Sequence, residues 1–162
     1  MLIKIVTPFN GQNNMREITG DIWSFASQGY IVVPTNGIVK ANGEAVMGAG
    51  MAKEAAARFP DLPKALGVRL NKTGNRNYYF KEYGVLTFPT KHDWKDPSDI
   101  KLITQSAVQL SKDLEVLRKQ DRNLRYFLPQ VGCGLGGLKW EDVREAVKPY
   151  LEDDMITFVI KG

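Results

Sequence analysis

Two glycine-rich turns constrain the fold of this chain more than any other feature. Residues 46–52 read VMGAGMA, and residues 131–137 read VGCGLGG. Each turn follows an apolar run suited to a buried strand, at residues 30–34 and 125–129, and each leads into a segment with helical character. Glycine permits such turns because it reaches positive φ without steric cost. Since both turns follow candidate central strands, we expect two backbone cradles that face one crevice.

The absence of side chains at these turns suggests a ligand. A glycine lets a polyanion approach main-chain N–H groups closely, and a helix N-terminus beside such a turn adds partial positive charge. The ligand that two facing cradles imply is a diphosphate held from both sides.

Length and composition describe an ordinary globular protein. The 162 residues fit one domain, which can bury a substantial core without disulfides or metals. Hydrophobic residues make up 43% and charged residues 25%, both of which are typical values. The formal charge of +4 comes from scattered basic residues. It permits a nucleic-acid partner without indicating one, and a solvated surface with a modest lysine excess is the simpler interpretation.

The single cysteine and the sequence of the first six residues favour a cytoplasmic location. Cys133 is the only cysteine, which excludes an internal disulfide framework and leaves no second thiol for a metal site. The first six residues are too short and too early charged for a signal peptide, and no apolar stretch has membrane-spanning length. We therefore expect a reducing compartment, no membrane partner, no metal and no cofactor.

The order of the predicted elements indicates an α/β fold. We expect strands at residues 2–6, 17–19, 30–34, 77–80, 85–89, 126–128 and 155–160. Helical segments are expected at residues 21–27, 49–58, 62–70, 98–120 and 139–150. The clearest helix is 98–120, where Ser98 is the expected cap and one apolar stripe recurs at three- and four-residue spacing, formed by Ile103, Ala107, Leu110, Leu114 and Leu117. Alternating strands and helices predict a mixed sheet covered on both faces, with binding loops at strand carboxyl ends.

Several polar residues at strand ends have both a structural and a ligand interpretation. Asp21 can cap the next helix, or its carboxylate can accept a hydrogen bond from a purine amino group. Asn36 and Asn42 each precede glycine, which predicts a turn, and either amide could also bind ribose hydroxyls. Lys91 is a surface lysine by default, but its place after a buried strand favours a cation aimed into the crevice, where it could attack an aldehyde or anomeric carbon. His92 is the only histidine of the chain, so it is either incidental or the residue that would serve any mechanism requiring a histidine.

Taken together, these motifs make nearly the whole chain resemble a macrodomain, the ADP-ribose-binding module. The resemblance implies a three-layer α/β/α fold with a central mixed sheet, residues 1–162 as a single macrodomain, and a monomer. It implies adenine contacts from Asp21 and Ile22. It also implies ribose and phosphate contacts from Asn36, Met47, Gly48, Ala49, Gly50 and Met51, and diphosphate and distal-ribose contacts from Gly132, Cys133, Gly134, Leu135 and Gly136.

Two details narrow the resemblance to one branch. Residues 46–52 and 88–91 are similar to the macrodomain antitoxins that remove ADP-ribose from DNA bases, whereas residues 132–135 and 138–143 are similar to the terminal ADP-ribose protein glycohydrolase. Hydrolases of this branch use a lysine at the position matched by Lys91. In the protein glycohydrolase that lysine can attack C1″ of the distal ribose, and an aspartate assists at the position where this chain has Gly136. The DNA-acting antitoxins carry glycine there, as this chain does.

The resemblance implies ADP-ribose binding and hydrolysis of C1″-linked ADP-ribose. Such an enzyme is an ADP-ribosyl glycohydrolase or an ADP-ribose-1″-phosphate phosphatase, and its partner is ADP-ribose or an ADP-ribosylated substrate, including ADP-ribosylated nucleic acid. The alternative is a non-catalytic ADP-ribose reader with the same pocket. A site for a flavin or nicotinamide nucleotide is less consistent with the sequence, because no Gly-x-Gly-x-x-Gly element opens a helix with an acidic residue downstream.

Overall fold

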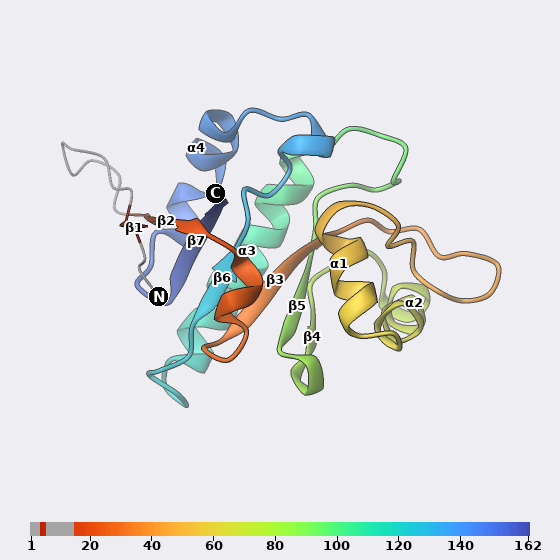
Figure 1. Ribbon diagram of the computed structural model, residues 1–162, viewed down its shortest axis with the longest axis horizontal. Helices are drawn as coiled ribbons and strands as arrows, with labels where there is room; N and C mark the ends of the chain where they lie inside the picture. Colours follow the sequence, from red (N-terminus) through yellow and green to blue (C-terminus); the bar gives the residue numbers. More distant parts are fainter. Residues whose placement is uncertain (1–3, 6–14) are drawn as a thin grey trace.

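The structure, a computed structural model, describes residues 4–5 and 15–162. Its strands are β1 (Lys4–Ile5), β2 (Arg16–Gly20), β3 (Tyr30–Thr35), β4 (Tyr78–Phe80), β5 (Val85–Pro89), β6 (Tyr126–Leu128) and β7 (Ile156–Lys161). Its α-helices are α1 (Gly50–Arg58), α2 (Leu62–Thr73), α3 (Ile100–Leu117) and α4 (Trp140–Leu151). Short 3₁₀ helices are η1 (Ile22–Phe25), η2 (Lys81–Tyr83) and η3 (Gly134–Gly136). The predicted alternation of strands and helices is confirmed (Figure 1), and residues 2, 3 and 6 of the first predicted strand lie outside the described residues.

The strands form one mixed sheet in the order β1-β2-β7-β6-β3-β5-β4. The five inner strands, β2, β7, β6, β3 and β5, are parallel to one another, and β1 and β4 pair antiparallel at the two edges. Because the inner strands run the same way, their carboxyl ends meet at one edge of the sheet. The loops that follow β3, β5 and β6 are thereby brought together.

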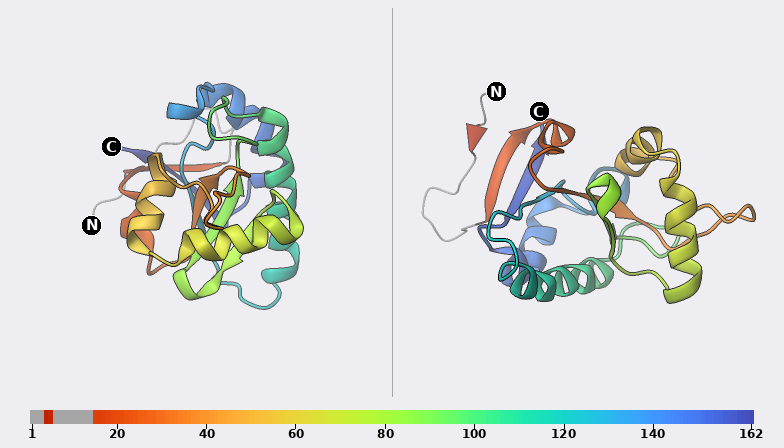
Figure 2. Two further views of the ribbon diagram at one scale, coloured as in Figure 1. Left: turned by 90° about the vertical axis from the view of Figure 1, so that its right-hand side faces the viewer. Right: turned by 90° about the horizontal axis from the view of Figure 1, so that it is seen from below.

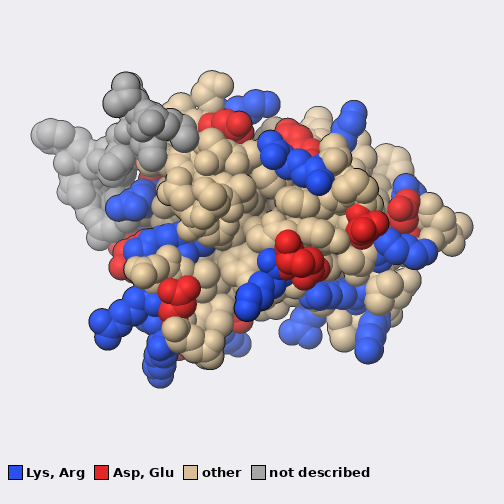
Figure 3. Space-filling view, turned by 60° about the horizontal axis from the view of Figure 1, so that its bottom comes forward, with Lys and Arg blue, Asp and Glu red and all other residues tan. Residues whose placement is uncertain are grey.

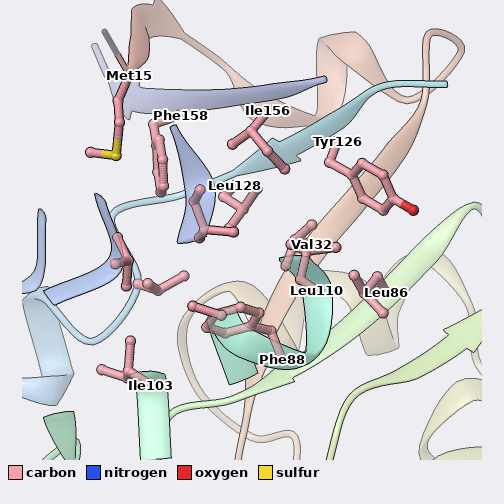
Figure 4. Close-up of a cluster of buried hydrophobic side chains, with 14 of the residues drawn as sticks. Met15, Val32, Leu86, Phe88, Ile103, Leu110, Tyr126, Leu128, Ile156 and Phe158 are labelled. Atoms are coloured by element: carbon pink, nitrogen blue, oxygen red, sulfur yellow. The ribbon is translucent and has the colours of Figure 1, made fainter. Parts of the chain in front are cut away.

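Alternating side chains of each inner strand pack against different helical layers. On β3, Val32 lies in the cluster beneath α3 and α4, whereas Ile31 and Val33 lie in the cluster beneath α1 and α2. Figure 4 shows Val32 near Leu110 of α3, which belongs to the predicted apolar stripe. This alternation follows from the two-residue period of a strand, and it gives the sheet two buried faces.

The helices cover both faces and complete three layers. Helices α3 and α4 pack against each other on one face, and α1 and α2 lie over the other. In the right-hand view of Figure 2, α3 runs along one side of the sheet, away from α1. The predicted three-layer α/β/α arrangement is therefore confirmed. No helix in the described part of the chain is both long and apolar enough to cross a membrane.

The start of α3 differs from the prediction. Asp99 is its N-cap, and the Asp99 carboxylate accepts a hydrogen bond from the Lys101 N–H at 2.9 Å. Ser98, the predicted cap, is buried, and its N–H donates to the Gly136 carbonyl oxygen. The prediction that Ser98 caps this helix is therefore wrong, because Ser98 packs against the second glycine turn one residue before the helix begins.

A buried ion pair ties β2 to α4. The Glu17 carboxylate is almost fully buried and accepts two hydrogen bonds from Arg144, at 3.0 and 3.1 Å, and a third from Trp140 Nε1 at 3.1 Å. A buried carboxylate is costly unless it is paired and hydrogen-bonded, and both conditions hold here. The pair therefore anchors α4, which follows the second glycine turn, to the sheet.

Candidate functional site

A cavity of about 870 Å³ opens at the carboxyl ends of β3, β5 and β6. Both glycine turns line it, together with the loop between β5 and α3, and Figure 1 shows these segments on one side of the molecule. Its volume falls in the range of pockets that hold ligands of nucleotide size. Twelve of the predicted site residues lie in its wall: Lys91, Asn36, Met47, Gly48, Ala49, Gly50, Met51, Gly132, Cys133, Gly134, Leu135 and Gly136.

The first turn presents main-chain donors at the start of a helix. Within the described part of the chain, the N–H groups of Gly48 and Ala49 donate no hydrogen bond. Ala49 is the N-cap of α1, and no side chain caps that helix end. The first N–H groups of a helix lack intrahelical acceptors, so an anion at this point would satisfy them and meet the positive end of the helix dipole.

Asn36 holds the first turn in place. Its Nδ2 donates to the Val46 carbonyl oxygen at 3.0 Å, and its Oδ1 accepts from the Ile38 N–H at 3.0 Å. The amide thus links the end of β3 to the beginning of the turn. Asn42, the other candidate amide, bonds to Glu44 in an exposed loop and does not line the cavity.

The second turn is built from left-handed glycines. Gly132, Gly134 and Gly137 have φ of 80°, 65° and 81°, and the Leu138 N–H closes the turn onto the Gly132 carbonyl oxygen at 3.1 Å. Only glycine adopts such φ values readily, which explains the composition of the turn. The N–H groups of Gly134 and Leu135 donate no hydrogen bond to any described residue. A second set of donors therefore lines the same cavity.

Gly136 has no room for a side chain. A Cβ at this position would lie 2.2 Å from Ser98 Oγ and 3.1 Å from Ser98 Cβ. Because Ser98 is buried, this neighbour cannot give way easily. The structure thus gives a packing reason for glycine where the protein glycohydrolase has an aspartate.

Lys91 lies in the cavity wall, in the loop that follows β5. Its main-chain N–H donates to the Thr35 carbonyl oxygen at the end of β3, and its carbonyl oxygen accepts from Asn75 Nδ2 at 3.0 Å. Its Nζ lies 3.5 Å from the Trp94 carbonyl oxygen. The backbone of Lys91 is thus held from two sides, and the residue lines the cavity.

His92 lies outside the cavity wall and closes the loop that follows β5. Its Nε2 lies 3.0 Å from Asp99 Oδ2, and the Asp99 N–H donates to the Thr90 carbonyl oxygen at 2.9 Å. The hydrogen bond from His92, followed by that from the Lys101 N–H, holds the pKa of Asp99 below its ordinary value. These bonds join the two ends of the loop, so the residues between them form a closed segment.

Asp21 and Ile22 do not line the cavity. Asp21 is the N-cap of η1, and its Oδ1 accepts from the Trp23 N–H at 3.1 Å, which is the structural role that the sequence allowed. The residue follows β2, which is separated from β6 by β7, at the same edge of the sheet as the cavity. Its adenine-binding role therefore stays a prediction.

The structure adds residues that the sequence analysis did not single out. Trp94, Lys95 and Asp96, from the loop after β5, line the cavity, as does Gln130 after β6. Asp96 is the one carboxylate among the described lining residues.

Burial, followed by the charge of Glu141, raises the pKa of the Cys133 thiol, so this residue stays protonated and packs as a small apolar side chain. In the described part of the chain, no cluster of three His, Cys, Asp or Glu residues could hold a metal ion.

Comparisons with known proteins agree with this geometry. No protein-family model matches the chain. A curated DNA ADP-ribosyl glycohydrolase from Thermus aquaticus is 29% identical over 140 residues, which cover 79% of this chain and 37% of that protein. The macrodomain of Thermus aquaticus DarG matches with a TM-score of 0.70 at 25% identity, over 91% of this chain and 97% of that one. Thermosipho africanus DarTG in complex with ADP-ribose matches with a TM-score of 0.76 at 24% identity, over 98% of this chain and 43% of that one.

The three-layer fold and the paired glycine turns define a macrodomain. Within that class, the chain is similar to the macrodomains of the DarG branch, as both the sequence and the structure comparisons indicate. The chain spans less than half the length of the curated relatives that it matches.

Proposed function

We propose that this macrodomain binds ADP-ribose and hydrolyses the bond between C1″ of its distal ribose and a DNA base. The observation that carries the proposal is the pair of glycine turns, whose N–H groups at Gly48, Ala49, Gly134 and Leu135 have no acceptor among the described residues and line one cavity. A diphosphate supplies acceptors for such donors, and preorganised N–H groups bind it without reorganisation. The similarity to DNA ADP-ribosyl glycohydrolases supports DNA as the leaving partner.

Hydrolysis in this proposal consumes one water. The bond between C1″ and the base nitrogen breaks, the water oxygen joins C1″, and a proton passes to the base. Lys91 either stabilises charge while water attacks C1″, or its amine displaces the base from C1″ and water then breaks the C1″–Nζ bond to release the lysine. In both routes Asp96 supplies the carboxylate that accepts the proton of the water. Gly136 provides no aspartate for this task, so the proposal assigns a DNA base rather than a protein carboxylate as the leaving group. We expect the enzyme to act as a monomer in the cytoplasm.

Substitution of Lys91 tests the proposal. We expect Lys91→Ala to lower the turnover of an ADP-ribosylated single-stranded oligonucleotide by about 100-fold or more, because charge stabilisation or nucleophilic attack at C1″ is lost. Its affinity for free ADP-ribose, measured by calorimetry, should change by less than about tenfold, since the N–H donors remain. Asp96→Asn should likewise lower the rate more than the affinity.

The matched control is Lys101→Ala, which removes an exposed lysine outside the cavity and should keep the wild-type rate. If Lys91→Ala keeps the wild-type rate, the catalytic assignment is wrong. If the wild-type protein binds ADP-ribose tightly but turns over neither the oligonucleotide nor ADP-ribose-1″-phosphate, the protein is a reader.

A further inference from the structure

Trp94 differs from the other two tryptophans of the chain. The Trp23 and Trp140 side chains donate hydrogen bonds to Glu54 and Glu17, at 2.8 and 3.1 Å. Trp94 is 52% exposed, its indole N–H donates to no described residue, and the Lys95 Nζ lies over its ring at 6.0 Å from the centroid. Leaving a large aromatic ring in water forgoes the free energy of burial, so this ring has a face available to a partner.

The backbone of Trp94 is held close to Lys91. Trp94 lies in the closed loop between Thr90 and Asp99, and its carbonyl oxygen is 3.5 Å from Lys91 Nζ. A tight turn holds the residue, in which the Lys95 N–H donates to Asp93 Oδ1 at 3.0 Å. Trp94, which lines the cavity, therefore belongs to the part of its wall next to Lys91, where the group bonded to C1″ would lie.

A second exposed apolar residue lines the same cavity from another loop. The described part of the chain has four large exposed hydrophobic residues, Val68, Trp94, Val116 and Leu135, and only Trp94 and Leu135 line the cavity. Leu135, at 75%, is the most exposed of the four and comes from the second glycine turn. The cavity thus has an aromatic and an aliphatic side chain at its margin, beyond the polar backbone cradles.

The charge of this region does not favour a phosphate backbone as the recognised group. Lys91 and Lys95 are balanced by Asp93 and Asp96, and Lys95 Nζ lies 3.9 Å from Asp93 Oδ2. Figure 3 shows a further face of the molecule, on which basic and acidic side chains are likewise interspersed. A flat, apolar surface next to balanced charges suits a planar aromatic group better than a polyanion.

We propose that Trp94 is a stacking platform for the unpaired nucleobase bonded to C1″ of ADP-ribose, with Leu135 bounding the same space. This inference rests on the proposed function and names the residue that selects a base-linked substrate. A phosphate leaving group has no π face, whereas every nucleobase has one, so the platform discriminates between these two classes of C1″ substituent.

The experiment compares substrates that share ADP-ribose and differ in the leaving group. Kd and turnover are measured for free ADP-ribose, ADP-ribose-1″-phosphate, an ADP-ribosylated nucleoside and an ADP-ribosylated single-stranded oligonucleotide. Base stacking on an aromatic side chain is worth about 1–3 kcal/mol, which corresponds to about 5- to 150-fold in affinity. We expect Trp94→Ala to weaken binding of the nucleoside and the oligonucleotide by such a factor relative to its effect on ADP-ribose-1″-phosphate, and Trp94→Phe to restore most of the loss. Val116→Ala, which alters a similarly exposed apolar residue that does not line the cavity, is the matched control.

Each outcome decides the inference. An equal effect of Trp94→Ala on all ligands, or no effect on any, would overturn it. So would wild-type binding of the nucleoside that is no tighter than binding of free ADP-ribose, or an effect that appears only with flanking nucleotides. The binding measurements do not depend on turnover, so a wild-type protein that binds but does not hydrolyse fails the proposed function and still tests the platform.

Discussion

Gly48 differs from the other glycines of the two turns. Gly50, Gly132, Gly134 and Gly137 have positive φ, and Gly136 packs against Ser98. Gly48 has neither constraint: its φ is not in the left-handed region, and no protein atom lies within 4 Å of the position that a Cβ would take. The protein alone therefore gives no reason for glycine at this position, whereas a ligand held by the Gly48 N–H would occupy that space.

Gly48→Ala tests this interpretation at the scale of one residue. We expect its affinity for ADP-ribose to fall by about tenfold or more, because the added methyl group occupies the approach to the N–H donors. The free energy of unfolding should stay within about 0.5 kcal/mol of the wild-type value. Calorimetry and urea unfolding measure the two quantities. An unchanged affinity would show that the first turn does not contact the diphosphate.

At the scale of elements, the contact between β2 and α4 depends on one buried carboxylate. Glu17 and Arg144 are separated by 127 positions in the chain and become neighbours because β2 pairs with β7, which follows α4 directly. Trp140, in the first turn of α4, donates to the same carboxylate. These bonds hold the helix that follows the second glycine turn.

Arg144→Met should destabilise the fold by about 3 kcal/mol, because it leaves the Glu17 carboxylate buried without its cation. The double variant Glu17→Gln/Arg144→Met should cost less than the single variant, since the unpaired charge is then removed as well. Urea unfolding measures both, and Arg76→Met, at an exposed site, should change the free energy by no more than about 0.5 kcal/mol. A cost for Arg144→Met as small as that of the control would contradict the role of this pair.

At the scale of the whole molecule, the cavity joins the two helical layers. Its first turn leads into α1 on one face of the sheet, and its second turn leads into α4 on the other. β3 and β6, which these turns follow, are neighbours in the sheet. A ligand that contacts both turns should therefore stabilise the entire structure.

We expect thermal unfolding in one cooperative transition, which also tests the prediction of a single domain. ADP-ribose at 100 times its Kd should raise the free energy of unfolding by about 2.7 kcal/mol. For a chain of this length, that corresponds to a rise in Tm of about 5–10 °C. Calorimetry and circular dichroism should report the same shift. Two transitions, of which only one responds to ADP-ribose, would contradict both expectations.

Most of the local structure could be predicted from the sequence, because its causes are local. The two-residue alternation of Ile31, Val32 and Val33 reflects strand geometry, and the apolar stripe containing Ile103 and Leu110 reflects the helical period. Errors arose where a distant segment competes for a residue. Ser98 is an adequate cap in isolation, but the second glycine turn engages it, and Asp99 caps the helix in its place.

By itself, the sequence determined the alternation of strands and helices, the two glycine turns and the place of Lys91 at a strand end, since each follows from neighbouring residues. Only the tertiary structure decided which loops share the cavity, because the sheet order places β3 between β6 and β5 rather than in chain order. That order puts Trp94 and Leu135 at one cavity and leaves Asp21 outside its wall. It also packs Ser98 against Gly136, so contacts between distant segments determined which side chains the site can contain.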